Sequence, residues 1–577
     1  MNARRAALIA GLSIVASLTV LVSARLIAAM EQTALAAMMP DGALLYLESA
    51  DFQSLISDWN QSPEKQSWLK SDNYAVFSRS RLFGRLAEAQ SEFATAAGLP
   101  PDMQLVSEIA GKQSAFAWYD IGKLEFVYLT RMPSGAFNQS RLWQARGKFE
   151  QREAAGADFY IRVDPQSGRT VAFAATDDWV ILGTREDLIA GTLALVKGQK
   201  SRSIGDEAWY ADAIAQSKSP GDLRMVLNLE KIVPSPYFRS YWVQQNITEM
   251  KQYRAAISDL YRDKSVYREE RVLLRRANTA PVETATDISA LAASVPPTAG
   301  FYQALASPGT SRTLAILKDK LLDPKPANIE NTSYAPNPAL TEEQAGQASD
   351  LDKRIDEAPP EVSGVGLPTA DPWESLKGVL EASQVSGLLQ VESSASEAGS
   401  IFIGFHSAVV LSATADWQID RLNAALSSGL EARLTASRLG VQWSQKDGYQ
   451  QCDGLLPLFL STQGRYLILS NDRDLLLSLK TRLSRPSSAG EAAVYVAGLN
   501  HTGESEAFSR ITTLIDSANQ RRGTGGDSDS NSPGGSPAFF SGNIGSFSHT
   551  FNAVASERMI VRDEGEKVTQ TVTYEWK

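Results

Sequence analysis

Short apolar runs of strand-like character alternate along this chain with stretches in which apolar residues recur at helical spacing. Residues 170–184, "TVAFAATDDWVILGT", predict two strands joined at Asp177 and Asp178. Residues 185–198 then predict a helix, and residues 456–483 repeat the same order of strand, turn, strand and helix. The alternation predicts an α+β fold of mainly antiparallel sheet with helices on one face.

Three pairs of segments match in the same order along the chain, which indicates an internal duplication. The pairs are "MPDGALLYLES" (39–49) with "PPTAGFYQALA" (296–306), "GLPPDM" (98–103) with "GLPTAD" (366–371), and "WVILGTREDL" (179–188) with "YLILSNDRDL" (466–475). The last pair aligns without gaps, from an aromatic residue through three aliphatic residues to an Asp-Leu step. We therefore expect two related α+β halves, at residues 38–233 and 291–577.

The region between these halves, residues 234–290, predicts a helical segment, either one long amphipathic helix or a bent pair. Apolar residues recur there at helical spacing, at Ile247, Met250, Tyr253, Ile257, Leu260 and Tyr261. An aromatic cluster near its start consists of Tyr237, Phe238, Tyr241 and Trp242. This cluster either seats the helix on the domain or forms a platform for a carbohydrate or a protein partner.

The remaining segments predict loops and one terminal strand pair. Residues 323–337 are rich in proline, and residues 520–537 form a low-complexity stretch of glycine, serine and aspartate. Polar and apolar residues alternate on both sides of Asp563, Glu564 and Gly565, which predicts a C-terminal hairpin or meander.

The amino-terminal segment predicts a membrane anchor. Arg4 and Arg5 precede residues 6–22, which carry no charge. This run is long for the apolar part of a cleavable signal peptide and short for a spanning helix. A cut at Ala34-Leu35-Ala36 is the alternative, but that site lies some distance beyond the apolar run. We expect residues 1–30 to be an uncleaved signal anchor with a cytoplasmic amino terminus, so that the body lies in the periplasm or outside the cell.

Charge and cysteine content exclude several classes of partner and site. The formal net charge is −10 and the isoelectric point is near 5.2, so nucleic acid is not expected as a partner. Cys452 is the single cysteine of the chain, so it forms no intramolecular disulfide and no site of several thiolates. We expect it to be a small buried apolar side chain.

Two signatures of serine acylases adjoin one another in "SWLKSDNY". Ser67 and Lys70 form S-x-x-K, and S-D-N begins at Ser71. In the acylating enzymes these motifs come from separate segments that face each other, with a K-T-G strand that this chain lacks. We interpret the stretch as a helix end in which Trp68 and Leu69 pack inward and Ser71, Asp72 or Asn73 caps the next helix.

Metal and acid-base chemistry have equally little support in the sequence. The three histidines, His406, His501 and His549, lie far apart, and His406 is expected in a strand. Residues 527–538 begin like a calcium loop, but Ser532 and Ala538 replace the required glycine and glutamate. The pair Asp177 and Asp178 is explained by its turn. We therefore nominate no catalytic residue, no metal ligand and no cofactor.

The anchor followed by "MPDGALLYLES", the "GLPPDM" segment and the doubled "WVILGTREDL" unit resemble a family of bacterial exported, membrane-anchored proteins defined as a domain of unknown function. The stretches "SWLKSDNYAVFSRSRLFGRL" and "FRSYWVQQNI" are similar to members of that family. The resemblance spans most of the chain and implies an envelope location. It implies no activity, so it transfers no catalytic residue.

These observations together predict a single-pass protein of the bacterial cell membrane whose exported body consists of two α+β halves. We expect a non-catalytic binding or scaffold protein, with the membrane as one partner and an envelope protein or glycan as another. The alternative is a hydrolase that acts on glycan or peptide. A sensory ectodomain is disfavoured because only about five residues precede the apolar run.

Overall fold

The computed structural model describes residues 35–62, 81–235, 250–277, 288–323, 371–396, 403–434, 441–452, 457–485, 493–504 and 554–577, with residues 65, 69, 74 and 78. The expected anchor, the aromatic cluster at Tyr237, the predicted loops apart from Asp323, the serine acylase-like residues and the calcium-like stretch lie outside these residues. None of the described helices is both long enough and apolar enough to cross a membrane.

The chain divides into two compact units. The first comprises the described parts of residues 1–62, 81–262 and 271–277. The second comprises the described parts of residues 63–80, 263–270 and 278–577. Both are α+β, as the sequence predicts.

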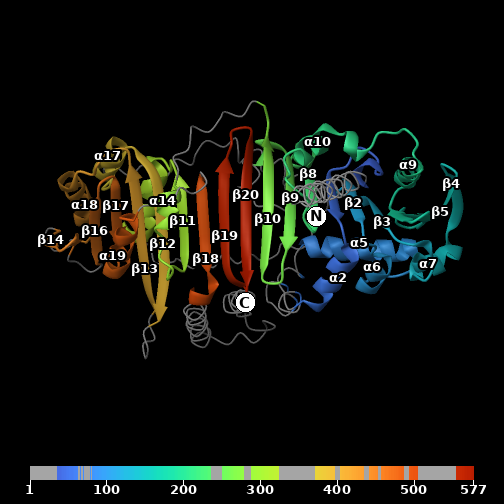
Figure 1. The fold of residues 1–577 in the computed structure, drawn as a ribbon, viewed down its shortest axis with the longest axis horizontal. Helices are drawn as coiled ribbons and strands as arrows, with labels where there is room; N and C mark the ends of the chain where they lie inside the picture. The colour runs from blue at the N-terminus through green and yellow to red at the C-terminus, as the bar shows by residue number, and fades with distance from the viewer. Residues whose placement is uncertain are drawn as a thin grey trace, which may run out of the picture. The chain divides into compact units, whose positions relative to one another are not determined.

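The first unit contains an antiparallel sheet (Figure 1). In spatial order its strands are β4 (Glu150–Ala154), β5 (Ala157–Val163), β6 (Thr170–Thr176), β7 (Trp179–Gly183), β3 (Glu125–Arg131), β2 (Ser114–Asp120), β1 (Leu45–Ser49), β8 (Leu223–Asn228) and β9 (Tyr253–Arg262). Strand β10 (Val266–Arg275) pairs with β9.

The second unit has the same strand order, with each strand number higher by ten. Its strands are β14 (Trp443–Lys446), β15 (Tyr449–Cys452), β16 (Leu458–Gln463), β17 (Tyr466–Ser470), β13 (Ile403–Ala413), β12 (Val385–Ser396), β11 (Phe301–Ala306), β18 (Tyr495–Asn500), β19 (Val554–Asp563) and β20 (Lys567–Trp576). The predicted C-terminal hairpin is confirmed, since Asp563 of β19 pairs with Val568 of β20.

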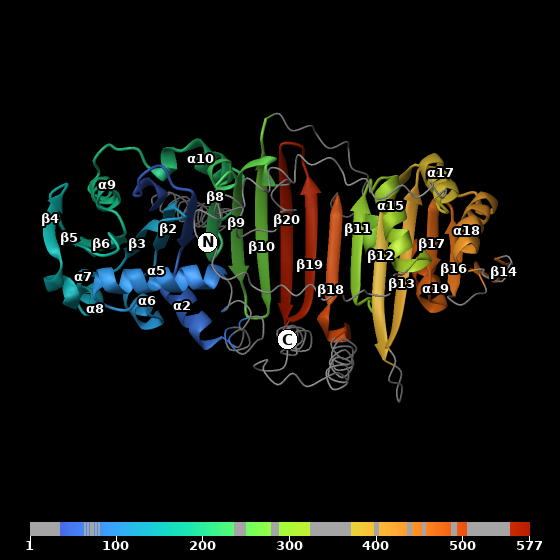
Figure 2. The same ribbon diagram turned by 180° about the vertical axis from the view of Figure 1, so that it is seen from behind.

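Helices of the first unit occupy the connections between its strands. They are α2 (Phe52–Gln61), α5 (Arg81–Ala97) and α6 (Met103–Ile109) between β1 and β2, α7 (Ser134–Phe137) and α8 (Arg141–Gln144) after β3, α9 (Glu186–Val196) and α10 (Ala208–Ile214) after β7, and α11 (Leu229–Ile232) after β8. Figure 2 shows α5 lying across the strands of this sheet. Short 3₁₀ turns follow at Ala145–Lys148 and Ile204–Asp206.

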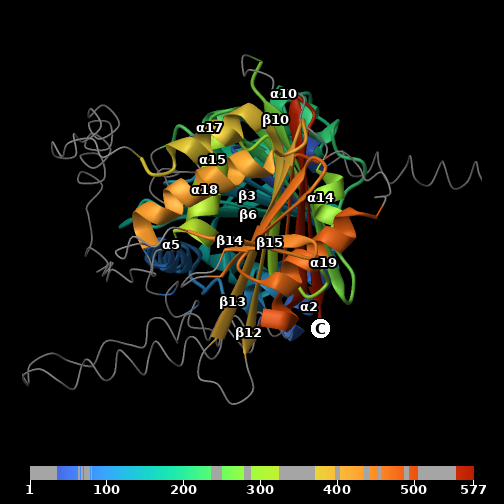
Figure 3. The same ribbon diagram turned by 90° about the vertical axis from the view of Figure 1, so that its left-hand side faces the viewer.

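Helices of the second unit occupy corresponding connections. They are α14 (Ser289–Ala293) before β11, α15 (Thr310–Leu317) with the π turn Lys318–Leu322 and α17 (Glu374–Ser383) between β11 and β12, α18 (Ile419–Leu434) after β13, and α19 (Arg473–Leu483) after β17. Figure 3 shows α17 and α18 on one side of β12 and β13, with α14 and α19 on the other.

The prediction of helices on one face is wrong, because helices cover both faces of each sheet. In β7, Val180 and Leu182 pack against α5 to α8, whereas Ile181 packs against α9 and α10. The matched strand β17 divides its residues in the same way, between the helix pair α17 and α18 and the helix pair α14 and α19. Strands buried on both faces have no polar side, so they read as continuous apolar runs.

The predicted helical segment at residues 234–290 is also wrong over its described central part, where β9 and β10 form strands. Tyr253 and Ile257 are four residues apart, a spacing that one face of a helix and one face of a strand share. Ala255, two residues from each of them, is fully buried in the same core as Ile257. Burial at every second residue is the periodicity of a strand and not of a helix. Antiparallel pairing of β9 with β8 therefore overrides the helical pattern.

Several local predictions are confirmed. Asp177, with a φ of 53°, joins β6 to β7, and Gly464, with a φ of 55°, joins β16 to β17. Cys452 is buried in a core of the second unit. The prediction that Leu69 packs inward is wrong, since Leu69 is 47% exposed. Single apolar side chains are common on protein surfaces, so residue type alone does not ensure burial.

A close helix contact in the second unit depends on a glycine. Trp373 is 1% exposed and lies directly before α17. A Cβ at Gly429 of α18 would overlap the Trp373 ring, whereas a Cβ at Gly378 of α17 would meet nothing within 4 Å. The small residue therefore sets how closely α18 approaches the tryptophan.

Replacing these glycines should have opposite effects on stability. Gly429→Ala should lower the free energy of unfolding by about 1 to 3 kcal/mol through overpacking, despite the better helix propensity of alanine. Gly378→Ala, the matched control, should raise it by about 0.5 to 1 kcal/mol. Chemical denaturation of the full chain measures both, and equal stability of the two variants would contradict the Trp373 contact.

Candidate functional site

The helices between β1 and β2 leave a cavity against the sheet of the first unit. Along α5, Leu86, Ala89 and Phe93 follow at intervals of three and four residues and face the sheet. Leu86 is nevertheless 41% exposed, because that part of α5 borders open space rather than packed side chains. The apolar stripe therefore forms a cavity wall near Leu86 and Ala89, whereas Ala96 and Ala97 at the end of the helix are buried in a core.

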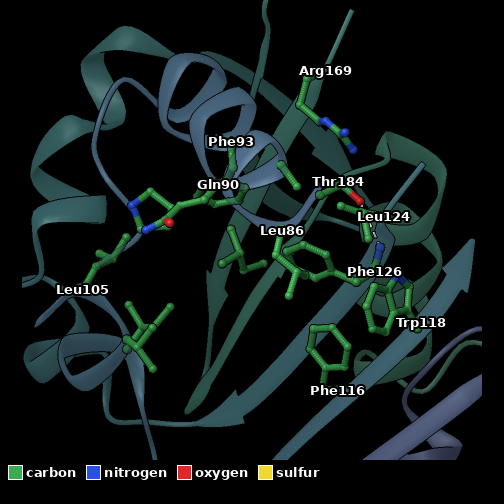
Figure 4. Close-up of a pocket in the computed structure, with 15 residues that line it drawn as sticks. Leu86, Gln90, Phe93, Leu105, Phe116, Trp118, Leu124, Phe126, Arg169 and Thr184 are labelled. Carbon is green, nitrogen blue, oxygen red and sulfur yellow. Dashed lines mark hydrogen bonds between the residues drawn. The ribbon is translucent and has the colours of Figure 1, made fainter. Parts of the chain in front are cut away.

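The cavity has a volume of about 360 Å³ (Figure 4). Leu105 of α6 contributes to one wall, and Phe116 and Phe126, from the paired strands β2 and β3, contribute to the opposite wall. Carbon atoms make up most of its surface. Such volume and composition are typical of small-molecule sites.

A second cavity of about 340 Å³ continues the first across the sheet. The two share five wall residues: Val106, Ile109, Phe116, Phe126 and Leu182. The second extends to Leu47 of β1 and Leu223 of β8, and its exposed wall is entirely apolar. Together they form an elongated apolar space beneath α5 and α6.

Aromatic rings define the floor of this space. The rings of Phe116 and Phe126 are stacked with centroids 5.2 Å apart, and Phe93 of α5 lies 6.5 Å from Phe126. Trp118 meets Phe116 edge-on at 6.0 Å. Rings held by one another in this way keep a fixed wall without filling the space above them.

Two largely buried polar side chains, Arg169 and Thr184, lie at one end of the first cavity, whereas the polar wall residue Gln90 is exposed. The Arg169 side chain is 13% exposed and pairs with Glu92 of α5, with Nε donating to Oε2 at 3.0 Å. Arg169 also donates to the Lys123 carbonyl. Thr184 is 6% exposed, and its hydroxyl accepts a hydrogen bond from the Phe126 amide at 2.9 Å. In Figure 4, Arg169 and Thr184 lie on the same side of the cavity, away from Phe116.

The corresponding helices of the second unit pack more closely. Between β11 and β12, Leu317, Leu376 and Leu380 are each 1% exposed in a core with strand residues. Between β1 and β2, by contrast, α2 has no buried residue. The same strand order therefore accommodates closely packed helices in the described part of this connection.

The opposite face of the first sheet carries a buried charge ladder. Glu48, Arg224 and Asp259 are opposite one another on β1, β8 and β9. Arg224 Nε donates a hydrogen bond to Asp259 Oδ1 at 2.7 Å, and the Tyr46 hydroxyl donates one to Glu48 Oε2 at 2.8 Å. Burial raises the pKa of the Glu48 carboxyl to about 7. This cluster lies with Tyr46 in the core under α10, and Glu48 also contributes to the wall of the second cavity.

The histidines considered in the sequence lie in separate places. His406 lies in β13, as expected, and its Nδ1 is 2.9 Å from Asp472. His501 is 4% exposed, and burial lowers its pKa to about 4. Within the described part of the chain, no three histidine, cysteine or carboxylate residues form a group that could hold a metal.

The cavity is the feature that sequence reasoning missed. Alternating aromatic residues in "SAFAWYD" and "LEFVYLTRM" place Phe116, Trp118 and Phe126 on one face of two paired strands. That signal indicates an aromatic face. It does not reveal that a cavity separates parts of α5 and α6 from this aromatic face. The distance between a helix and a sheet is set by tertiary packing.

Three crystal forms of TP0453 are similar to part of this chain. Form IV has 9% identity and covers 41% of this chain and 79% of that chain. Form I has 10% identity and covers 43% and 80%, and form III has 8% identity and covers 42% and 81%. The TM-score is 0.24 in each case, which supports no argument about fold or function. No protein-family model and no curated protein matches the chain.

The buried Glu48 should make stability depend on pH. Its pKa in the folded chain, about 7, lies above the ordinary value of 4.5, so folding favours the protonated form. The free energy of unfolding should therefore be highest below pH 4.5 and fall as pH rises through 7. The fall should be on the order of 3 kcal/mol.

Glu48→Gln should remove this fall, because glutamine stays neutral throughout. Glu153→Gln, at an exposed position of β4, is the matched control and should leave the dependence intact. Denaturant titrations of the full chain across this pH range measure the effect. An unchanged slope in Glu48→Gln would contradict the assignment to Glu48.

Proposed function

We propose that the chain is an envelope-anchored, non-catalytic binding protein whose first unit holds a single hydrocarbon chain. The observation that carries this proposal is the pair of adjoining apolar cavities, which share Phe116, Phe126 and Leu182. An elongated space with polar groups at one end matches a linear ligand better than a compact one. The close packing of Leu317, Leu376 and Leu380 in the described part of the second unit contrasts with this space.

The energetics favour a chain of substantial length. Each buried methylene contributes about 0.8 kcal/mol. Association itself costs about 4 kcal/mol or more in lost freedom. A chain of roughly ten buried methylenes therefore leaves about 4 kcal/mol, which corresponds to millimolar binding, whereas a chain of about four leaves none.

The alternative of a glycan or peptide hydrolase has no comparable support. Such enzymes commonly use two facing carboxylates. Glu48 is the single carboxylate among the wall residues of the two cavities, and its side chain turns to the other face toward Tyr46.

An uncleaved amino-terminal anchor remains part of the proposal. Leu35 and Ala36 are 3% and 0% exposed in the core of the first unit. A cut after Ala36 would remove both side chains from that core. The body would then lie in the periplasm or outside the cell, consistent with the resemblance to exported proteins.

Duplication of one ancestral unit is the origin that we propose for the two units. Their identical strand order supports it, together with the three matched segments. The correspondence extends to single side chains: Val180 and Leu182 in β7 match Leu467 and Leu469 in β17, and each pair faces the helices inserted after the first and third strands of its unit.

Filling the cavity should abolish binding. In Ala89→Trp, the new ring would occupy the cavity wall and displace several methylenes of a bound chain. The affinity for lauryl alcohol should fall by about tenfold or more. Ala87→Trp, on the exposed side of the same helix, is the matched control and should bind as the natural chain does. The measurement is equilibrium binding of radiolabelled lauryl alcohol to the full chain in lipid nanodiscs, with empty nanodiscs as background. Equal binding by both variants would contradict the proposed site.

Membrane fractionation tests the anchor. We expect the full-length protein in the membrane fraction, with its mass showing that residues 1–36 are retained. A soluble species that begins near Ala37 would contradict the anchor and would also show that Leu35 and Ala36 are dispensable for the core.

A further inference from the structure

Resting on the proposed function, we infer that the cavity selects single-chain amphiphiles with an uncharged head that accepts hydrogen bonds. The head lies at Arg169 and Thr184, and the chain runs past Phe116 toward Leu223. Monoacylglycerols are ligands of this class, whereas ionised fatty acids are not.

The orientation follows from the distribution of polar groups. Arg169 and Thr184 contribute to the wall of the first cavity and not to that of the second. Leu223 contributes to the second cavity only, and Phe116 lies where the two meet. A ligand with one polar end leaves fewest polar groups unpaired when that end lies beside Arg169.

The preference for a hydrogen-bond acceptor follows from the N–H and O–H groups of Arg169 and Thr184 that have no acceptor among the residues that the structure describes. Each nitrogen of the Arg169 guanidinium makes one hydrogen bond, to Glu92 or to the Lys123 carbonyl. Its two terminal nitrogens each carry a second N–H. The Thr184 hydroxyl already accepts from the Phe126 amide, so its own hydrogen is the group left to donate. Both side chains therefore present donors.

The preference for an uncharged head follows from Glu92. Its carboxylate neutralises Arg169, and the two side chains are 25% and 13% exposed. A ligand carboxylate would place a second anion beside one cation in a partly desolvated site, where like charges repel strongly. An ester or hydroxyl head meets the same donors without that repulsion. Glu92 thus acts as a specificity-determining residue.

A comparison of monolaurin with laurate tests the inference, since the two share a chain and differ in the head. The assay is equilibrium binding to the full chain in nanodiscs at mildly alkaline pH, where laurate is ionised. The natural chain should bind monolaurin at least about tenfold more tightly than laurate. Glu92→Gln leaves Arg169 uncompensated, so it should raise the affinity for laurate by about tenfold and reduce or reverse the preference.

Two further variants make the outcome specific. Glu186→Gln removes another carboxylate paired with an arginine, 2.6 Å from Arg152 and away from the cavity walls, and it should leave the preference unchanged. The double variant Glu92→Gln with Arg169→Gln should lose the gain in laurate affinity, because the cation is removed with its partner. A gain that persists in the double variant would overturn the role of Arg169.

Lauryl alcohol binding separates this inference from the proposed function. Equal binding of laurate and monolaurin, or no response to Glu92→Gln, would overturn the inferred head selection. If Ala89→Trp still blocked lauryl alcohol, the cavity would stand as a chain-binding site. If lauryl alcohol binding were absent or unaffected by Ala89→Trp, both proposals would fail.

Discussion

Burial of apolar side chains on both faces of each sheet is the constraint on which the rest of this structure depends. Ile181 points to one core while its neighbours Val180 and Leu182 point to the other, and β17 repeats this division. A sheet of this kind requires two helix layers. The connections after the first and third strands of each unit supply one layer. The segments before the first strand and after the seventh supply the other.

Sequence patterns predicted much of this arrangement because hairpins carry local signals. The turns at Asp177 and Gly464, the helix after each of them and the C-terminal hairpin all follow from residues close in sequence. The errors have a common physical origin. Tyr253 and Ile257 fit a helix and a strand equally well, and only pairing with β8 distinguishes the two. Continuous apolar runs likewise indicate burial without stating how many faces are covered.

Sequence patterns did not predict the cavity, and a comparison of the two units shows why. The strand register places Phe116 and Phe126 at the positions equivalent to Gln390 of β12 and Ser407 of β13. The aromatic rings stack on one another along the sheet, whereas Gln390 is 3% exposed and hydrogen-bonds to Gln303 and Glu392. Residue type therefore differs at these positions, but whether a helix layer fills the space above the aromatic rings depends on packing between distant segments, which a single sequence does not encode locally.

The unfilled space also has an energetic consequence. A closed, empty cavity of 360 Å³ would cost on the order of 8 kcal/mol, comparable to the whole stability of a typical domain. The first unit limits this cost by leaving the cavity partly open, at the expense of apolar exposure at Leu86. A bound chain would cover the aromatic wall and supply the missing contacts. Occupancy and stability of the first unit are therefore linked, because a ligand that binds only the folded unit stabilises it.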